Sequence, residues 1–217
     1  MRGRKGLMTF IAGLLMMSPS FAQSDAKAKA ILAEVSKKFR SYDVVKADFT
    51  YTYTNQQANT KENQSGTLYV KSKTNKFKVI LPSQELISDG KNQWTYLKED
   101  KEVQVSEIDN SENALNPAKI FTIYEKGFKY VYTGEAKANN KVYQNIELAP
   151  LTTRSFSKIK LRVDKQNKQI SSFAIHDKNG NIYTYTVKIF TPNVKVAESL
   201  FSFNAAKYPG VEVVDLR

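Results

Sequence analysis

The sequence predicts a mainly β protein of the α+β class, with one large curved antiparallel sheet, a barrel or a sandwich covered by short helices. From residue 45 onward, apolar and polar residues alternate with a period of two in many short segments. Turn-forming Asn, Asp, Gly and Pro residues separate nearly all of them. Two segments with helical character, residues 25–42 and 116–127, stand outside this pattern. Strands with one apolar face need such a cover or a second sheet.

The first 22 residues have the three parts of a secretory signal peptide. Arg2, Arg4 and Lys5 form a basic start, an apolar run follows over residues 7–17, and small residues precede a predicted cut after Ala22. The apolar run is shorter than the roughly 20 residues of a membrane-spanning helix, which disfavours a retained anchor. Residues 23–217 are expected to form a single exported domain.

The composition excludes several kinds of site. The chain has no Cys, so it has neither a disulfide, nor a thiolate metal site, nor a Cys for acylation after the signal peptide. The formal charge is +12, and removing the signal peptide takes away three basic and no acidic residues, which leaves +9. Because the charges are spread and the protein is predicted to be exported, the sequence predicts no nucleic-acid partner. The charge is instead expected on the outer face of the sheet.

Residues 25–42 are expected to form one amphipathic helix, capped by Ser24 or Asp25. Its apolar stripe recurs at helical spacing and consists of Ala28, Ile31, Leu32, Val35, Phe39 and Tyr42. Such a stripe packs on a core or covers an opening, and the pattern does not separate the two.

Nine strands are expected from the alternation of apolar and polar residues. They span residues 45–54, 65–72, 75–81, 93–97, 103–105, 143–150, 158–164, 169–177 and 181–190. Between the strands, residues 116–127 begin with Asn and Pro and end at Gly127, which predicts a short, mostly apolar helix. Together with the first helix, it is expected to cover the concave face of the sheet.

Few residues in the sequence have the character of catalytic groups. His176 is the only His, and no Gly-x-Ser-x-Gly motif or phosphate-binding loop accompanies it. Glu99 and Asp100 lie in a charged turn, where solvation explains them. We therefore expect no enzyme, no catalytic residue, no metal and no cofactor, with a secreted hydrolase as a minor alternative. The abundant feature is an apolar, aromatic face, which either fills with side chains or encloses an apolar ligand.

Several stretches together resemble the LolA family, the periplasmic carriers of outer-membrane lipoproteins. They are YDVVKADFTYTY, SGTLYVKS, ELISDGKNQWTYLKEDKEVQV, NPAKIF and the C-terminal FSFNAAKYPGVEVVDLR, in this order over most of the chain. The resemblance implies an incomplete antiparallel β-barrel with an apolar concave face under helical lids. It also implies a chaperone that takes acylated lipoproteins from an inner-membrane ABC transporter across the periplasm to an outer-membrane acceptor, and works as a monomer.

On this reading the cavity needs apolar area rather than reactive groups. By position, we expect it to be lined by Phe49, Tyr51, Leu68, Val70, Val79, Leu81, Trp94 and Tyr96. The lid is expected to include Ile31, Val35, Phe121 and Tyr124. Ordinary core packing is the alternative for Trp94 and Tyr96. A one-residue change of register would turn any strand's residues to the opposite face.

Two positions concern the family's lid and docking contacts. Where known members have Arg-Pro-Asn after the second strand, this chain has residues 71–75 without Arg or Pro, so Lys73 is only a candidate latch. Phe77 matches a family Phe that contributes to transporter docking, and a core position is its alternative.

Other functions on the same fold remain open from the sequence. A carrier or sensor of another amphiphile, such as a glycolipid or pigment, is the main alternative, because one fold serves several cargoes. A membrane-anchored acceptor is disfavoured by the missing Cys, and a full-length sensor by the lack of a second domain.

Overall fold

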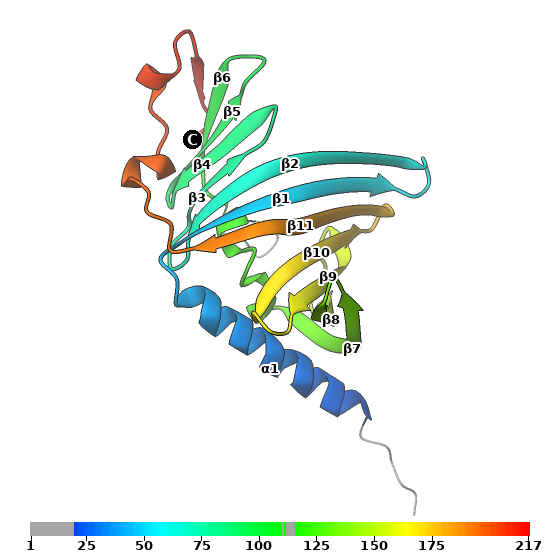
Figure 1. The fold of residues 1–217 in the computed structure, drawn as a ribbon. Helices are drawn as coiled ribbons and strands as arrows, with labels where there is room; N and C mark the ends of the chain where they lie inside the picture. The colour runs from blue at the N-terminus through cyan, green and yellow to red at the C-terminus, as the bar shows by residue number, and fades with distance from the viewer. Residues whose placement is uncertain (1–19, 110, 112–115) are drawn as a thin grey trace, which may run out of the picture.

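The computed structural model describes residues 20–109, 111 and 116–217 of the protein. Their strands form one 12-stranded sheet in the order β12-β6-β5-β4-β3-β2-β1-β11-β10-β9-β8-β7, which leaves β12 and β7 as open edges (Figure 1). All neighbours pair antiparallel except β12 and β6. This open, strongly curved sheet agrees with an incomplete barrel. Within the described residues, no helix is long and apolar enough to span a membrane.

The strands differ widely in length. They are β1 (Val44–Asn55), β2 (Thr60–Lys71), β3 (Lys76–Ile80), β4 (Gln84–Asp89), β5 (Asn92–Leu97), β6 (Glu102–Glu107), β7 (Phe128–Ala138), β8 (Lys141–Pro150), β9 (Phe156–Asp164), β10 (Gln169–Asp177), β11 (Asn181–Pro192) and β12 (Glu212–Asp215). The long strands β1, β2 and β11 project beyond the rest of the sheet at their far ends (Figure 1).

Bulges bend the sheet toward its inner face. The register shifts between Asp48 and Phe49 where β1 pairs with β11, and between Tyr132 and Gly134 where β7 pairs with β8. Gly134 sits at its bulge with φ 117°, a value that favours Gly. Because a bulge bends its strand and increases the local twist, these irregularities help to give the sheet a concave inner face.

The predicted turns lie where the sequence placed them. Asp89 accepts hydrogen bonds from the backbone N–H groups of Lys91 and Asn92, and Gly90 follows it with φ 97°. Asn139 and Asn140 both have positive φ between β7 and β8, as a tight hairpin turn requires.

Helix α1 (Ser20–Arg40) packs against β7 and β10 and so covers one side of the inner face (Figure 1). Ala28, Leu32, Val35 and Phe39 recur at helical spacing and are all buried. Three basic residues in the last turn favour the helix through its dipole. The helix ends at Arg40, so Tyr42 lies beyond it and packs its ring against Phe190 at 5.9 Å.

The prediction of one short helix over residues 116–127 is wrong in type. This segment forms two 3-10 turns, η1 (Pro117–Lys119) and η2 (Ile123–Glu125). Asn116 caps the first turn as expected, accepting from the N–H of Ala118 at 2.8 Å. Thr122 interrupts the helical backbone between the two turns, because its φ is −139°. Its hydroxyl donates to the carbonyl of Lys119. The three β-branched residues of this segment, Ile120, Thr122 and Ile123, and its short length disfavour an α-helix.

Three strands are absent from the sequence-based expectation. In β4 the apolar residues Leu86 and Ile87 are adjacent, so one lies on each face of the sheet. The strand therefore lacks the alternation of apolar and polar residues that identifies a strand in the sequence. β7 pairs only with β8, and β12 is a four-residue parallel strand on β6. The predicted signal peptide lies mostly outside the described residues and stays a prediction.

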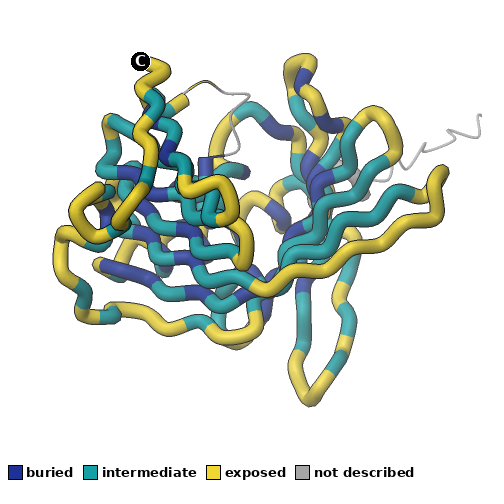
Figure 2. The backbone as a smooth tube through the Cα atoms, turned by 90° about the horizontal axis from the view of Figure 1, so that it is seen from above, coloured by how far each residue is buried: buried dark blue, intermediate teal, exposed yellow. Residues whose placement is uncertain are grey.

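The core lies on the inner face of the sheet, between the strands, α1 and residues 118–128. The buried residues gather along the middle of the strands, and the hairpin ends are exposed (Figure 2). A second buried group lies on the outer face of β4–β6 and comprises Ile87, Val103, Val105 and Phe201. The segment after β11 reaches this outer face, with η3 (Glu198–Phe201) and η4 (Ala205–Lys207).

Ion pairs fasten this C-terminal segment to the sheet. The carboxylate of Glu198 accepts from Lys71 of β2 at 2.9 Å and also from Lys76 of β3. The hydrogen bonds from Lys76 and Lys71 lower the pKa of Glu198 from 4.5 to about 2. The C-terminal segment is therefore held to β2 and β3 by a carboxylate that stays charged in mild acid.

We predict that Glu198 contributes to stability with a defined pH dependence. Because its folded-state pKa is lowered, its contribution is complete above the unfolded pKa of 4.5 and disappears as pH falls toward about 2. The unfolding free-energy difference between wild type and Glu198→Gln should therefore shrink through this window in urea titrations. An NMR-detected Glu198 pKa near 4.5 would contradict the prediction.

Candidate functional site

The inner face of the sheet holds a partly open cavity of about 470 Å³. Its walls come from β1, β2, β3, β4, β10 and β11, and residues 117–121 close it from the side of the lid. The lining is largely apolar and aromatic, and comprises Ala47, Phe49, Tyr51, Gln64, Leu68, Val79, Leu81, Ser83, Gln84, Leu86, Pro117, Ile120, Phe121, Phe173, Ile175, Tyr185 and Val187. This volume is within the usual range of small-molecule pockets.

Strand register explains why these side chains converge. Leu68 of β2 pairs with Val79 of β3, and Val79 pairs with Leu86 of β4. Phe49 and Tyr51 of β1 pair with Val187 and Tyr185 of β11 in the same way. Directly opposed residues share a face, so each pair adds two side chains to the same wall.

Gly66 leaves room for the aromatic wall beside it. A Cβ atom at this position would come within 2.7 Å of both the Phe49 ring and Leu81, and 3.0 Å from the carbonyl oxygen of Ile80. The Phe49 ring therefore packs over bare backbone, and a larger residue on β2 would displace it.

The cavity is an unfavourable place for charge. Burial raises the pKa of Tyr185 to about 12, and Tyr51 and Tyr183 add to the shift. Burial also raises the pKa of Tyr51. Tyr185 stacks on Phe173 with ring centroids 4.6 Å apart, and Tyr51 lies 5.1 Å from it. A site with these properties retains apolar groups and excludes ions.

The four expected lid residues have different positions. Phe121 lines the cavity and packs its ring 4.9 Å from Phe39 of α1. Val35 is buried in the core, and Ile31 packs against it from α1. Tyr124 is also buried, where its hydroxyl accepts a hydrogen bond from Ser36 at 3.0 Å. Only Phe121 touches the cavity, and the other three support the segment that closes it.

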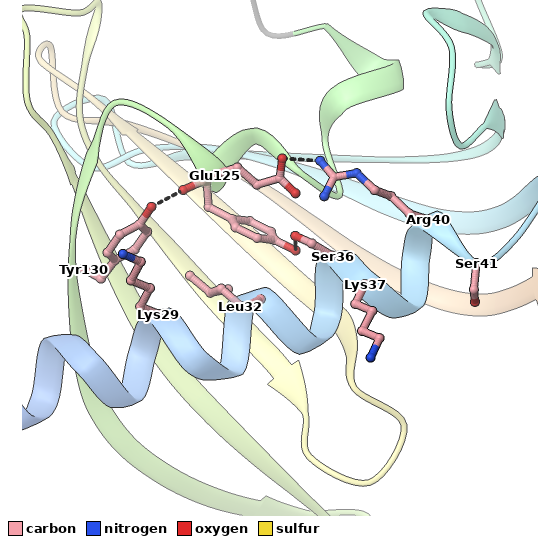
Figure 3. Close-up of a pocket in the computed structure, with 10 residues that line it drawn as sticks. Lys29, Leu32, Ser36, Lys37, Arg40, Ser41, Glu125 and Tyr130 are labelled. Atoms are coloured by element: carbon pink, nitrogen blue, oxygen red, sulfur yellow. Dashed lines mark hydrogen bonds and ion pairs between the residues drawn. The ribbon is translucent and has the colours of Figure 1, made fainter.

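A second hollow of about 540 Å³ lies on the other side of this segment, between α1, η2 and β7 (Figure 3). Its floor includes Leu32 and Tyr124, and its rim is cationic, with Lys29 and Lys37. Arg40 on the rim pairs with Glu125. Burial raises the pKa of Tyr124 above its ordinary value, so its hydroxyl stays protonated. Charged groups border this hollow, whereas apolar walls surround the cavity.

The prediction that Trp94 and Tyr96 line the cavity is wrong. Trp94 pairs with Ile87 and Val105, while the neighbouring Thr95 pairs with the cavity residue Leu86. Both aromatic residues therefore lie on the outer face. There Tyr96 packs against Tyr208 and Phe203 of the C-terminal segment, with centroids 4.8 and 6.4 Å away. The alternative of ordinary packing is what the structure shows for Tyr96.

Three other expected residues do not touch the cavity. Val70 is fully buried on the inner face, beyond the cavity's end. Phe77 is 0% exposed, which agrees with the core alternative and leaves no free aromatic for docking. Lys73 is exposed in the turn after β2 and borders a surface hollow with Asp43. Among the described residues it makes no hydrogen bond to the lid, so it does not act as a latch in this structure.

Sequence reasoning missed about two thirds of the residues that line the cavity. Phe173, Ile175, Tyr185 and Val187 come from predicted strands with a correct inward alternation, but were not assigned to a cavity. Their signal was present, because Ile175 and Phe173 alternate with polar or small neighbours on β10. Leu86 was hidden in a strand that the pattern did not reveal.

His176 lies on the outer face of β10, opposite Lys158 of β9. Burial lowers its pKa, and the nearby Lys160 and Lys158 lower it further. Its neighbour Ile175 is the residue that faces the cavity. This position gives the hydrolase alternative no support.

We predict that Gly66→Ala destabilises the protein by about 1–3 kcal/mol, the usual cost of overpacking a core. The new methyl group must displace Phe49 and Leu81, and backbone at Ile80 limits its retreat. Urea denaturation measures the change, with Ser65→Ala at the exposed neighbouring position as the control. Equal stability of both variants would contradict the prediction, because it would mean that Phe49 and Leu81 move aside without energetic cost.

Comparison with solved structures finds one protein with the same fold and several weaker likenesses. An uncharacterized conserved protein of Thermus thermophilus superposes with a TM-score of 0.59 at 15% identity, covering 87% of this chain and 99% of that one. A DUF1329 family protein of Desulfovibrio piger gives 0.49 at 10%, with 82% and 97% covered. A LolA superfamily protein of Nitrosomonas europaea gives 0.45 at 10%, with 81% and 97% covered. A search of curated proteins found no significant match.

Comparison with family models identifies the chain by sequence. The model for the outer membrane lipoprotein carrier protein LolA matches residues 40–204, from the end of α1 to the C-terminal segment, which is well over half of the chain. The resemblance stated from the sequence motifs is thereby confirmed. The chain belongs to the LolA family.

Proposed function

We propose that this protein is a periplasmic carrier that shields the acyl chains of lipoproteins between the inner and the outer membrane. The observation that carries the proposal is the partly open apolar cavity between the curved sheet and residues 117–121, in a chain of the LolA family. The lining of the site provides apolar contact area, and we identify no reactive groups among the described residues that line it. It is suited to holding an acyl chain and not to transforming one.

The size of the cavity supports an acyl cargo. A methylene group is about as large as a water molecule, whose share of liquid volume is about 30 Å³, so the cavity holds about 15 methylene groups. Hiding each of them from water gains about 0.8 kcal/mol, or roughly 12 kcal/mol for one long chain. The cavity therefore has room for about one long acyl chain.

The cellular setting follows from the same proposal. An exported carrier receives its cargo from a transporter in the inner membrane and releases it to an acceptor on the outer membrane. A single cavity per chain is sufficient for one cargo, so the carrier works as a monomer. The predicted signal peptide, with a mature domain over residues 23–217, supplies the route to the periplasm.

Native mass spectrometry of the mature protein from its own periplasm tests the cargo. We expect a bound species with an acylated N-terminal Cys, which lipid extraction releases. A glycolipid or pigment in its place would keep the carrier and change its cargo. A protein that is empty, and that also takes up no lipoprotein from inner-membrane vesicles, would refute the proposal.

We predict that Val187→Glu lowers the affinity for a fluorescent acyl probe at least tenfold, while Ile189→Glu leaves it unchanged. Val187 lines the cavity, where an unpaired carboxylate is costly. Ile189 is on the same strand but 58% exposed on the outer face. Probe fluorescence gives both affinities, and circular dichroism verifies folding.

The cavity-filling variant Val187→Trp serves as a second test, because it removes volume without adding charge. It should also lower the affinity for the acyl probe. Unchanged binding by both Val187 variants would contradict the proposed site.

A further inference from the structure

A row of tyrosines continues the inner face beyond the cavity, toward the far ends of β1 and β11. Tyr51 and Tyr185 line the cavity and pair with each other. Tyr53 and Tyr183 form the next inward-facing pair, two residues farther out, with ring centroids 5.6 Å apart. The pair does not line the cavity and is only partly buried, so it lies open beside the cavity's end.

A hydrogen-bond network closes this row at its outer end. The Tyr53 hydroxyl donates to Oδ1 of Asn181 at 3.0 Å, and Asn55 donates to the same oxygen at 2.9 Å. Asn181 in turn donates to Asp177 at 2.7 Å, and the Tyr183 hydroxyl lies 3.4 Å from the same carboxylate. The tyrosine hydroxyls are thereby fixed in place, and polar groups end the row.

We propose that this tyrosine track, formed by Tyr51, Tyr53, Tyr183 and Tyr185, binds the extended polypeptide that follows the acylated N-terminus of the cargo. The inference rests on the proposed function, because it assumes that acyl chains occupy the cavity. The track starts at the cavity wall, so a chain that leaves the cavity in this direction meets it immediately.

The dimensions and the charges of the track favour a peptide. From Tyr51 to Asn55 the strand advances four residues, about 13 Å, which matches about four residues of extended peptide. Tyrosine binds at the boundary between apolar and wet surroundings, because its ring is apolar and its hydroxyl is polar. Backbone N–H groups of a peptide are suitable donors to the carboxylate and hydroxyl oxygens of this track.

Phosphate and sugar headgroups fit the tyrosine track less well than a peptide does. Glu62, opposite Tyr53 on β2, and Asp177 on β10 flank it with negative charge, which disfavours a phosphate. Burial acts to raise the pKa of Asp177, but hydrogen bonds from Asn181 and Asn179 lower it below its ordinary value, so the carboxylate stays charged. The paired rings are tilted by 41–49° and offer no common plane for a sugar ring.

The test compares two probes on one protein, palmitoyl-cysteine amide and the same molecule extended by four neutral residues. In wild type the extension should strengthen binding about tenfold, equivalent to about 1.4 kcal/mol. In Tyr53→Ala/Tyr183→Ala the extension should add less than about twofold, with palmitoyl-cysteine amide bound as in wild type. Isothermal titration calorimetry measures all four affinities.

Matched variants separate the track from general damage. Thr52→Ala/Thr184→Ala changes the adjacent pair on the same strands, whose side chains face outward, and should behave as wild type. Tyr53→Phe/Tyr183→Phe keeps the rings and should retain part of the gain. Circular dichroism establishes that each variant is folded.

Each contrary outcome is distinct. An extension that adds nothing in wild type, or equal weakening of both probes in the Tyr53→Ala/Tyr183→Ala variant, would overturn the track while leaving the carrier function intact. A larger gain for a palmitoylated sugar than for the peptide would assign the track to a glycolipid and overturn the proposal. Failure of wild type to bind either probe would refute the acyl-carrier function itself.

Discussion

The packing of Phe121 between α1 and the inner face of the sheet holds the segment that borders the cavity. Its ring lies 4.9 Å from Phe39 on the helix and meets Phe190 of β11 edge-on at 5.9 Å. Aromatic pairs of this kind contribute about 0.5–1.5 kcal/mol each beyond the area that they bury. Residues 117–125 contain only two short 3-10 turns, which have little stability of their own. The segment therefore stays on the sheet because of this ring and the neighbouring Tyr124.

The lid segment is held at both of its turns, with Ala118 buried in the first and Tyr124 in the second. Tyr124 is fixed through Ser36 and through its own carbonyl, which accepts from the Tyr130 hydroxyl at 2.7 Å. On its cavity side, Pro117 and Ile120 rest on the wall by apolar contact only. The cavity borders residues 117–121, and the hollow beside α1 (Figure 3) borders Tyr124 and Glu125 of the same short segment.

Sequence periodicity predicted most of the strands, the turns and the first helix, because each depends on local alternation or on residues with special backbone preferences. It also placed Phe49, Tyr51, Leu68, Val79 and Leu81 on the inner face, and all five line the cavity. The period states which residues share a face but not which face is inside. For β5 the answer depends on residues more than 100 positions away: Phe203 and Tyr208 cover Tyr96 from the outside. No local pattern in β5 contains that information.

The inner face changes character gradually along β1, and this gradient relates the fold to an amphiphilic cargo. Val45 is buried in the core, Ala47 and Phe49 are buried at the cavity wall, and Tyr51 and Tyr53 are half-buried, with the Tyr53 hydroxyl bonded to Asn181. Side chains with no polar atom thus occupy the dry end, and hydroxyl groups begin where water has access. The antiparallel pairing of β1 with β11 places a similar series of side chains on β11, so the same gradient runs along both strands. On the proposed function, an amphiphile bound along it would have its apolar end under Phe121 and its polar end at the strand tips, since the reverse orientation would bury polar groups without partners.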